Sequence, residues 1–268
     1  MKQRIPAFTA SDRMEDLLRS IERSGAAIVH GALPSSQVAD IERQIAPYLK
    51  TARSAQQQYS VRLAGLLAKS QAVVPVIALP LVRTVCDRFL LPYCSRYQVC
   101  GMQVVESVPG LTPGSLHRDD LLWPFPGKRP PMVINFLFAL TDCTFENGAT
   151  EVVVGSHKAR RDARKVKPGK EELDTFKEIR EQELTSAIMP SGSVLILLGG
   201  TIHRRGGNSS LRHKRRLLAI SFNLGWLRQE ENFYLSVPPE VVDGLPALVQ
   251  ELIGYAIHDP YLGQTGIQ

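Results

Sequence analysis

The sequence has no long apolar run, no closely spaced cysteine pair and no strong excess of one charge. Its longest apolar stretches, Val73–Val82 and Val194–Leu198, fall well short of the roughly 20 residues that a membrane helix needs. The first residues lack the apolar segment of a secretory signal. The four cysteines form no C-x-x-C pair and are too few for a disulfide framework. We therefore expect a soluble, cytoplasmic protein that spans no membrane and keeps its thiols free.

The composition indicates a globular protein with a real core. Apolar residues make up 44% of the 268 residues, which excludes disorder as the main state. Lys and Arg total 32 against 26 Asp and Glu, so the net charge of +6 is mild for this length. The basic stretches lack interleaved aromatic residues and any recognisable nucleic-acid module. We expect one domain over residues 1–268 and no nucleic-acid partner.

The first 92 residues have mainly helical patterns and are expected to support the rest of the chain. Apolar residues at helical spacing predict a helix over 11–24, with Ser11 as its N-cap and Gly25 as its stop. The remaining expectations for this part are a strand at 26–30, a helix beginning at 34–36, a polar loop at 51–60, and a helical region over 63–90 interrupted by Pro75 and Pro80.

From about residue 93 the pattern changes to short β-rich runs separated by Gly, Pro, Asn and Asp. The expected strands are 96–107, 132–140, 150–154, 193–198 and 216–224. A basic, helix-prone insertion over 158–185 interrupts this core, which spans 93–238, and a helix at 240–254 begins the closing segment 239–268. Helices followed by strands predict a mainly β fold with flanking helices, in which the sheet is antiparallel.

Three residues have the pattern of a metal site. On an extended chain, positions i and i+2 share a face, so His117 and Asp119 can point toward one ion. His203 follows the apolar strand Val194–Leu198. Two histidines and one carboxylate on one face are the ligands of non-haem Fe(II) oxygenases. His157 is the competing third ligand, although its Gly-Ser-His context favours a turn in which it bonds to the backbone.

Two arginines begin the strand that follows His203. An arginine binds a carboxylate with two parallel hydrogen bonds and stays charged when it is buried. Arg215 alternates with Leu217 and Ser221, whereas Arg216 shares a face with Phe222. Because that second face is suited to packing against a helix, we expect Arg215 to point inward.

The chain resembles the phytanoyl-CoA dioxygenase-like branch of the Fe(II)/2-oxoglutarate-dependent dioxygenases, from about Gly25 to Leu262. The final block is most similar to the subgroup that acts on meroterpenoids, alkaloids and other secondary metabolites. The resemblance is carried by Leu116–Asp120, Ala139–Asp142, Glu146–Thr150, Gly155–His157, His203 with Asn208, and Gly225–Asn232.

The resemblance implies a double-stranded β-helix, which is a cupin-like jelly roll, with iron bound inside. His117, Asp119 and His203 match the iron ligands, and O₂ is the further co-substrate. Arg215 matches the arginine that binds 2-oxoglutarate, with Arg212 and Arg216 as alternatives, and Thr150 matches a hydroxyl near that co-substrate. The sequence departs from the family pattern at Gly114 and Ser115, where glutamine is frequent, and at Val154, where proline is usual.

The expected activity is oxidation of C–H bonds in a hydrophobic small molecule. Trp123 lies four residues after Asp119, so it either lines the mouth of the pocket or packs in the core. One alternative is an acyl-CoA hydroxylase, in which Lys158–Lys170 would bind a diphosphate. Others are an iron-dependent isomerase that oxidises nothing and a binding homologue without activity. The subgroup also suggests a homodimer whose C-terminal segment helps to close the pocket.

Overall fold

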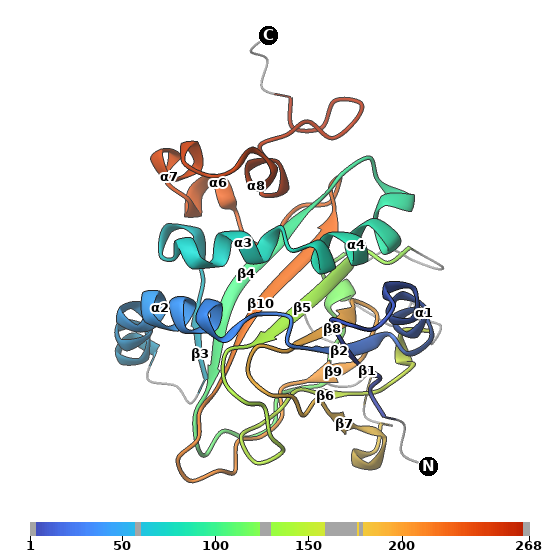
Figure 1. Ribbon diagram of the computed structural model, residues 1–268, viewed down its shortest axis with the longest axis vertical. Coiled ribbons are helices and arrows are strands. Elements are labelled where there is room, and N and C mark those ends of the chain that lie inside the picture. The colour runs from blue at the N-terminus through green and yellow to red at the C-terminus, as the bar shows by residue number, and fades with distance from the viewer. Residues whose placement is uncertain (1–3, 57–59, 124–129, 159–175, 177–178, 265–268) are drawn as a thin grey trace.

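Two facing β-sheets form the body of the protein (Figure 1). The computed structural model describes residues 4–56, 60–123, 130–158, 176 and 179–264. The large sheet has the strand order β1 (Ala7–Thr9), β2 (Ala26–His30), β8 (Val194–Leu198), β5 (Val133–Ala139), β10 (Arg215–Leu224), β4 (Tyr97–Ser107), β3 (Ser60–Leu63). The small sheet has the order β7 (Thr185–Ser186), β6 (Glu151–Val152), β9 (His203–Arg204). The architecture is the jelly roll with flanking helices that the sequence predicts.

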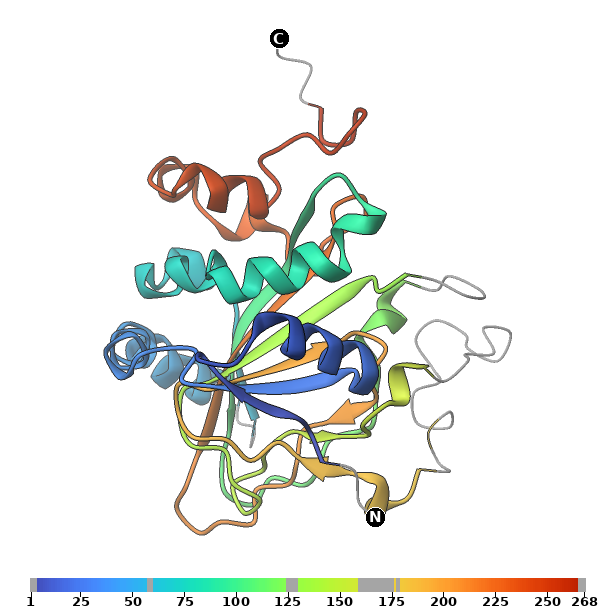
Figure 2. The same cartoon turned by 45° about the vertical axis from the view of Figure 1, so that its right-hand side comes forward.

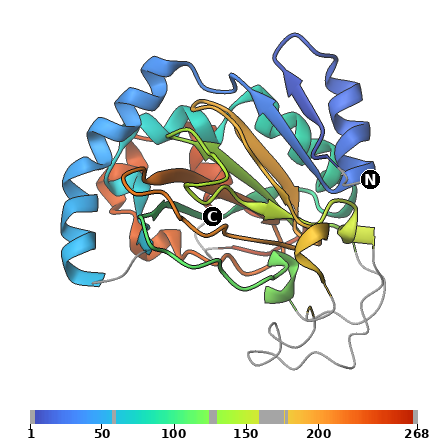
Figure 3. The same ribbon diagram turned by 90° about the horizontal axis from the view of Figure 1, so that it is seen from below.

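Helices cover one side of the large sheet and one end of the molecule. The first group is α1 (Met14–Ser24), α2 (Ser35–Gln56), α3 (Val74–Ile77) and α4 (Pro80–Phe89). They flank one side of the sheets, as the view from below shows (Figure 3). The second group is α6 (Phe233–Ser236), α7 (Pro239–Asp243) and α8 (Ala247–Leu252). Both side views place these three helices beside α3, at the end where the chain finishes (Figures 1 and 2).

Alternation along the strands divides the apolar residues into two cores. On β5, Phe136 and Phe138 are fully buried on the side of the helices, in the larger core. On the opposite face, Leu195 of β8 and Leu217 of β10 pack with Val152 of the small sheet. Strand β8 is apolar at every position because both of its faces are buried, one in each core. The space between the two sheets is therefore lined by side chains of alternate strand positions.

The first helix begins later than the sequence predicts. The residue before α1 is Arg13, and the Ser11 hydroxyl bonds to the Thr9 hydroxyl at 2.8 Å, so Ser11 is not the N-cap. Gly25 ends the helix as expected. Its φ of 73° is left-handed and its N–H donates to the Ile21 carbonyl at 2.7 Å. The strand expected at 26–30 is β2.

The polar segment 51–60 is not a loop in its first part, because α2 continues to Gln56. Arg53 in this last part of the helix forms two hydrogen bonds of 2.5 Å with the buried carboxylate of Glu106 on β4. This tertiary ion pair holds a polar sequence in the helical conformation. Residues 57–59 lie outside the described residues, and strand β3 follows at once.

Three strands of the large sheet come from the first 92 residues, so this part builds the sheet as well as covering it. Pro75 and Pro80 stand in the first turns of α3 and α4, which confirms the interruptions expected there. The single helix expected at 240–254 is two helices, α7 and α8. Pro246 separates them because a proline ring disfavours helical backbone at the preceding residue.

Most of the insertion at 158–185, including residues 159–175, lies outside the described residues. Its described ends are two single 3-10 turns and the short strand β7. Within the part of the chain that the structure describes, no helix has the length and apolar character to cross a membrane.

Candidate active site

His117, Asp119 and His203 converge between the sheets. Their ligand atoms all lie within 4.8 Å of one another. Asp119 Oδ1 is 3.6 Å from His117 Nε2, and Asp119 Oδ2 is 3.5 Å from His203 Nε2. The two histidines are direct antiparallel partners, and each backbone N–H donates to the other's carbonyl at 3.0 Å. Arg118 between the first two ligands is extended, so positions 117 and 119 share a face as the spacing predicts.

The hydrogen bonds of the two imidazoles fit them for a cation. His117 Nδ1 lies 3.0 Å from the Ser115 carbonyl, and His203 Nδ1 lies 3.0 Å from the Thr201 carbonyl. Carbonyl oxygens only accept, so these contacts assign the proton to Nδ1 and leave the lone pair of Nε2 pointing at the site. Burial lowers the pKa of His203, which favours the neutral form that binds metals. One carboxylate and two neutral imidazoles suit Fe(II).

Asn135 is a site residue that the sequence reasoning missed. Its Nδ2 donates to Asp119 Oδ2 at 2.6 Å, which fixes the orientation of the carboxylate. It lies on β5, and its register partner on β10 is Ser221. The available signal was composition, because Asn135 is the one polar residue in the apolar run Val133–Ala139.

Arg215 is a buried cation that forms no salt bridge with the described residues. Its side chain is 1% exposed, and its Nε and Nη2 have no hydrogen-bond partner among the described residues. Burial lowers the pKa of this guanidinium from its ordinary value to about 10. Since an unpaired buried charge is costly, a carboxylate from outside the chain would complete the site. The residue therefore fits the far carboxylate of 2-oxoglutarate.

Strand geometry separates Arg215 from the two alternatives. Arg216 points to the opposite face, where its Nε donates to Glu106 at 2.9 Å and its Nη1 pairs with Glu42. Arg212 is exposed in the preceding loop. Only Arg215 of the three lies on the face of β10 that looks into the space between the sheets, which agrees with the alternation in the sequence.

The remaining predicted residues occupy different settings. Thr150 is 5% exposed and stands two positions before Val152, whose side chain packs in the core between the sheets. Trp123 is 9% exposed and packs in the larger core, and its contribution to the mouth of the cavity stays a prediction. His157 Nε2 bonds to the Glu22 carbonyl at 3.0 Å and is not one of the three converging residues, so it has the backbone role expected for it.

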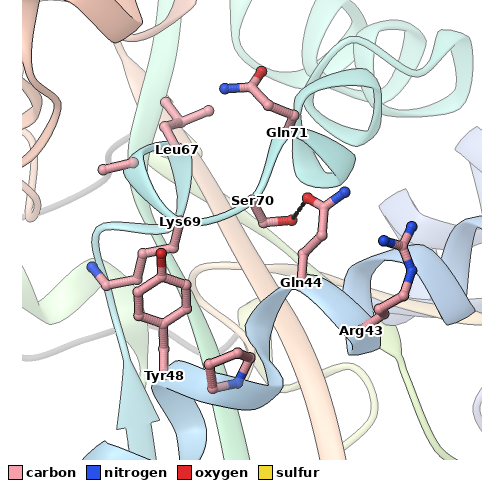
Figure 4. Close-up of a pocket in the computed structure, with 9 residues that line it drawn as sticks. Arg43, Gln44, Tyr48, Leu67, Lys69, Ser70 and Gln71 are labelled. Atoms are coloured by element: carbon pink, nitrogen blue, oxygen red, sulfur yellow. Dashed lines mark hydrogen bonds between the residues drawn. The ribbon is translucent and has the colours of Figure 1, made fainter.

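A separate surface pocket of about 460 Å³ lies between α2 and the turns that follow β3 (Figure 4). In the close-up, Gln44 and Ser70 are joined by a hydrogen bond of 2.9 Å, and Tyr48 lies beside Lys69. Lys69 donates to two backbone carbonyls, at 2.8 and 3.0 Å. None of the predicted site residues lines this pocket.

A jelly roll that gathers two histidines and an aspartate between its sheets, with a buried arginine on the inward face of β10, is typical of the cupin-like class of non-haem iron oxygenases. The family model described as phytanoyl-CoA dioxygenase (PhyH) matches residues 21–217, and the chain belongs to this family. The expectations of a dioxygenase and of an iron and 2-oxoglutarate site are confirmed by family, fold and ligand geometry.

Similar proteins extend over nearly the whole chain. "Dioxygenase swnH1" of Metarhizium robertsii is 26% identical, covering 97% of this chain and 87% of that protein. "Iron/alpha-ketoglutarate-dependent dioxygenase penM" of Penicillium thymicola is 25% identical, covering 95% and 82%. Among solved structures, the carbocyclase SnoK from nogalamycin biosynthesis has a TM-score of 0.64 at 16% identity and covers 85% of this chain and 92% of its own. The epimerase SnoN, in complex with Fe³⁺, alpha ketoglutarate and nogalamycin RO, has a TM-score of 0.59 at 19% identity, covering 84% and 90%. These structures share the fold.

Proposed function

We propose that the protein uses Fe(II), 2-oxoglutarate and O₂ to oxidise a C–H bond of a hydrophobic small molecule. The observation that carries the proposal is the presence of two features between the same two sheets. Three ligand atoms lie within 4.8 Å of one another, and Arg215, buried on the inward face of β10, has Nε and Nη2 atoms with no partner in the described part of the chain. A site that bound only a metal would not require the buried, unpaired Arg215.

Each residue has a definite task in this proposal. His117, Asp119 and His203 would hold the iron, while Asn135 keeps the Asp119 carboxylate in place. Arg215 binds the far carboxylate of 2-oxoglutarate, with the Thr150 hydroxyl assigned to the same co-substrate. Iron held there would supply the reaction of O₂ with 2-oxoglutarate, which gives succinate and CO₂ and is coupled to oxidation of the substrate. Apolar side chains between the sheets exclude water from this reaction.

The proposed substrate class is a secondary metabolite of the terpenoid or alkaloid type. Support comes from similarity to the fungal dioxygenases named above and to "Multifunctional dioxygenase ausE" of Penicillium brasilianum, which is 27% identical over 94% of this chain. Two solved structures with this fold are a carbocyclase and an epimerase of nogalamycin biosynthesis. Proteins with this fold thus carry out several kinds of reaction, so hydroxylation and rearrangement both fall within the proposal.

Succinate release tests the reaction and the substrate class together. The Fe(II)-loaded enzyme is supplied with 2-oxoglutarate, air and a panel of terpenoids, alkaloids, free acids and acyl-CoA thioesters. We expect iron-dependent succinate formation that a terpenoid or alkaloid stimulates. Asp119→Ala should abolish it, and His157→Gln, which alters a histidine outside the triad, should retain it. Stimulation by acyl-CoA alone would favour the acyl-CoA alternative, and undiminished activity of Asp119→Ala would overturn the proposed site.

We further propose that the protein is a cytoplasmic homodimer. All four cysteines are free, which favours a reducing compartment, and cell fractionation would test the location. The C-terminal region exposes Tyr234 (52%), Leu235 (84%) and Tyr261 (74%), and exposed apolar groups of this kind are typical of association surfaces. The Tyr234 and Tyr255 rings already pack against each other, with centroids 5.0 Å apart. We call these four residues the C-terminal apolar surface.

A further inference from the structure

The segment Gly225–Asn232 covers the inward face of the large sheet at the end of β10 that is remote from Arg215. Two side chains of the sheet hold it there. Gln98 Nε2 of β4 donates to the carbonyl of residue 227 at 2.7 Å, and Asn223 Nδ2 of β10 donates to the carbonyl of residue 228 at 3.3 Å. Gln98 and Asn223 are register partners, and Asn223 lies on the same face of β10 as Arg215. The segment therefore borders the space between the sheets.

Glu230 of this segment lies over the one glycine of β4. A Cβ built on Gly101 would be 3.6 Å from Glu230 Oε2 and 3.7 Å from Ser221 Oγ. Gly101 is the register partner of Ser221, which is in turn the register partner of Asn135. Asn135 donates to the Asp119 carboxylate at 2.6 Å. The Glu230 carboxylate therefore lies at one end of a row of the sheet whose other end contacts a proposed metal ligand.

The inward face of the sheet is open beside this row and closed toward Arg215. On β10, Ser221 and Ala219 are half-buried, whereas Leu217 and Arg215, further along the same face, are buried. On β5, the inward Leu137 is also half-buried. Leu137 is the register partner of Ala219, so the two form one apolar surface next to the row. A ligand that reaches Glu230 can therefore place its apolar part on these side chains.

The charge of Glu230 is accessible to such a ligand. Its side chain is exposed, and it forms no salt bridge within the described part of the chain. Partial burial of the carboxyl and the nearby charge of Asp119 raise the pKa of Glu230, which Arg62 partly offsets and Glu231 increases. Arg62 itself donates to Gln103 Oε1 at 3.2 Å. A cation bound at Glu230 would stabilise the ionised carboxylate and so reverse the rise.

We propose that Glu230 determines substrate specificity, because its carboxylate binds a protonated amine of the organic substrate. This assignment rests on the proposed function and deepens it, since it narrows the substrate to a molecule with a basic nitrogen on an apolar body. The class is then an alkaloid-type amine and not a neutral terpenoid. The ammonium group donates charge-assisted hydrogen bonds to Glu230, while the apolar body lies along Leu137 and Ala219. One fixed end orients the rest of the molecule toward the metal ligands.

Thermal unfolding with simple amphiphiles tests the site without knowledge of the natural substrate. The protein is saturated with Fe(II) and 2-oxoglutarate under nitrogen and titrated with octylammonium, octanol or octanoate at pH 7, where the amine is protonated. The three probes share an apolar chain, so differences between them report the charge. We expect the Tm shifts to give octylammonium at least a tenfold higher apparent affinity than octanol, with octanoate the weakest. Equal affinities of octylammonium and octanol, or a preference for octanoate, would overturn the proposal.

Variants of two glutamates decide whether Glu230 is responsible. Glu230→Gln keeps the size of the side chain and should lower the octylammonium affinity at least tenfold while leaving the octanol affinity unchanged. Glu230→Asp keeps the charge and should restore part of the preference. Glu240→Gln, which removes an exposed carboxylate of α7, should behave as wild type. A preference for octylammonium that survives in Glu230→Gln would refute the role.

Stabilisation by 2-oxoglutarate separates this result from a failure of the proposed function. Glu230→Gln should retain the full Tm shift that 2-oxoglutarate gives the Fe(II) protein, because the co-substrate is assigned to Arg215. A wild-type protein without that shift would contradict the proposed function itself. A loss of the shift in Glu230→Gln alone would assign Glu230 to the co-substrate site and refute its role toward the substrate.

Discussion

Arg215 and Arg216 are adjacent in sequence and have opposite roles. Arg216 forms salt bridges with two carboxylates, Glu106 on β4 and Glu42 on α2, and so links β10 to both elements. Arg215 has no salt-bridge partner within the described residues and lies where a co-substrate would supply one. The difference follows from the two-residue period of a strand, which is why the sequence alone predicts that Arg215 points inward.

Replacing Arg215 should separate stability from binding. A pKa lowered to about 10 corresponds to about 3 kcal/mol of penalty for the charged form in the folded state. Because the folded-state pKa of this base is depressed, the penalty is fully present at neutral pH. It disappears only as the pH rises through 10 toward the ordinary pKa of arginine. Arg215→Gln should therefore be at least as stable as wild type at pH 7 in urea denaturation, yet bind 2-oxoglutarate about 100-fold more weakly.

Anaerobic titration of 2-oxoglutarate into the Fe(II) protein measures the second half of this prediction, with Arg212→Gln as the control. A variant that lost stability but kept its 2-oxoglutarate affinity would show that Arg215 is a structural residue.

Asn135 should affect the metal more than the fold. Its amide holds Asp119 Oδ2 at 2.6 Å, so Asn135→Ala should weaken Fe(II) binding by about 10–100-fold. Competition with a chelator under nitrogen measures the affinity. Ser221→Ala is the matched control, since Ser221 is the cross-strand partner of Asn135 but bonds to the Gly101 carbonyl. Equal iron affinity in wild type and Asn135→Ala would contradict the role.

At the residue scale, the sequence predicts the triad and Arg215 but not Asn135. A motif indicates the triad, and the two-residue period of a strand indicates Arg215. Asn135 lies in an ordinary apolar strand, and its role comes from a contact with Asp119 in a distant segment, which no local pattern encodes.

At the element scale, Gly25 at the end of α1 contacts the residues beside the proposed metal site. A Cβ on Gly25 would collide with His157 Nδ1 and lie 2.5 Å from Thr201 Oγ1. The Thr201 hydroxyl donates to the Gly25 carbonyl at 2.8 Å, and the Thr201 carbonyl holds His203 Nδ1. The turn after α1 is thus packed against and hydrogen-bonded to Thr201, whose carbonyl orients the proposed metal ligand His203.

Two glycines of similar conformation give a matched pair for this effect. Gly31 has φ +66° with nothing within 4 Å of a built Cβ, so Gly31→Ala should cost about 1 kcal/mol of unfolding free energy for the left-handed backbone alone. Gly25→Ala has φ +73° and the collisions as well, so it should cost about 3 kcal/mol or more. Urea denaturation compares the two, and equal losses would show that the neighbours of Gly25 yield freely.

The ion pairs that anchor the last turns of α2 should be strongly stabilising as a unit. Glu106 is fully buried and accepts hydrogen bonds from both Arg53 and Arg216. Glu106→Gln would leave Arg53 without its anion and Arg216 with Glu42 alone, and it should cost about 3–5 kcal/mol. Glu22→Gln removes a carboxylate from an exposed pair with Arg88 and should change stability by less than about 1 kcal/mol. A small effect of Glu106→Gln in chemical denaturation would mean that the network contributes little.

The same network explains why the length of α2 could not be predicted. Residues 51–56 are polar and lack an apolar stripe, so local pattern favours a loop, whereas a carboxylate on a distant strand holds the helix. The strands, in contrast, are long apolar runs whose period is visible, and all five strands expected between residues 93 and 238 are present.

At the scale of the whole molecule, the C-terminal apolar surface should govern association. Leu235→Asp should convert the proposed dimer to a monomer in sedimentation velocity, because a charge at an apolar interface must be desolvated. Leu211→Asp is the control, since Leu211 is 92% exposed in a loop outside this surface. A wild-type protein that sediments as a monomer at micromolar concentration would refute the dimer.

The fold class could be predicted because helical and β-rich patterns occupy separate parts of the chain. The exact strand order could not, since β1, β2 and β3 come from the helical part and insert beside later strands. Joining such distant segments depends on burial of both faces of the large sheet, which only the assembled molecule provides.

The direct pairing of His117 with His203 couples the proposed metal site to the folding of the backbone around it. Two backbone hydrogen bonds between the segment of His117 and β9 bring the imidazoles together, with ring centroids 4.3 Å apart. A chain in which these two segments have not yet paired would contain all three proposed ligands without holding them in position for one ion. Iron binding by a newly made protein would then report the pairing of these segments, and a bound ferrous ion would stabilise the paired state.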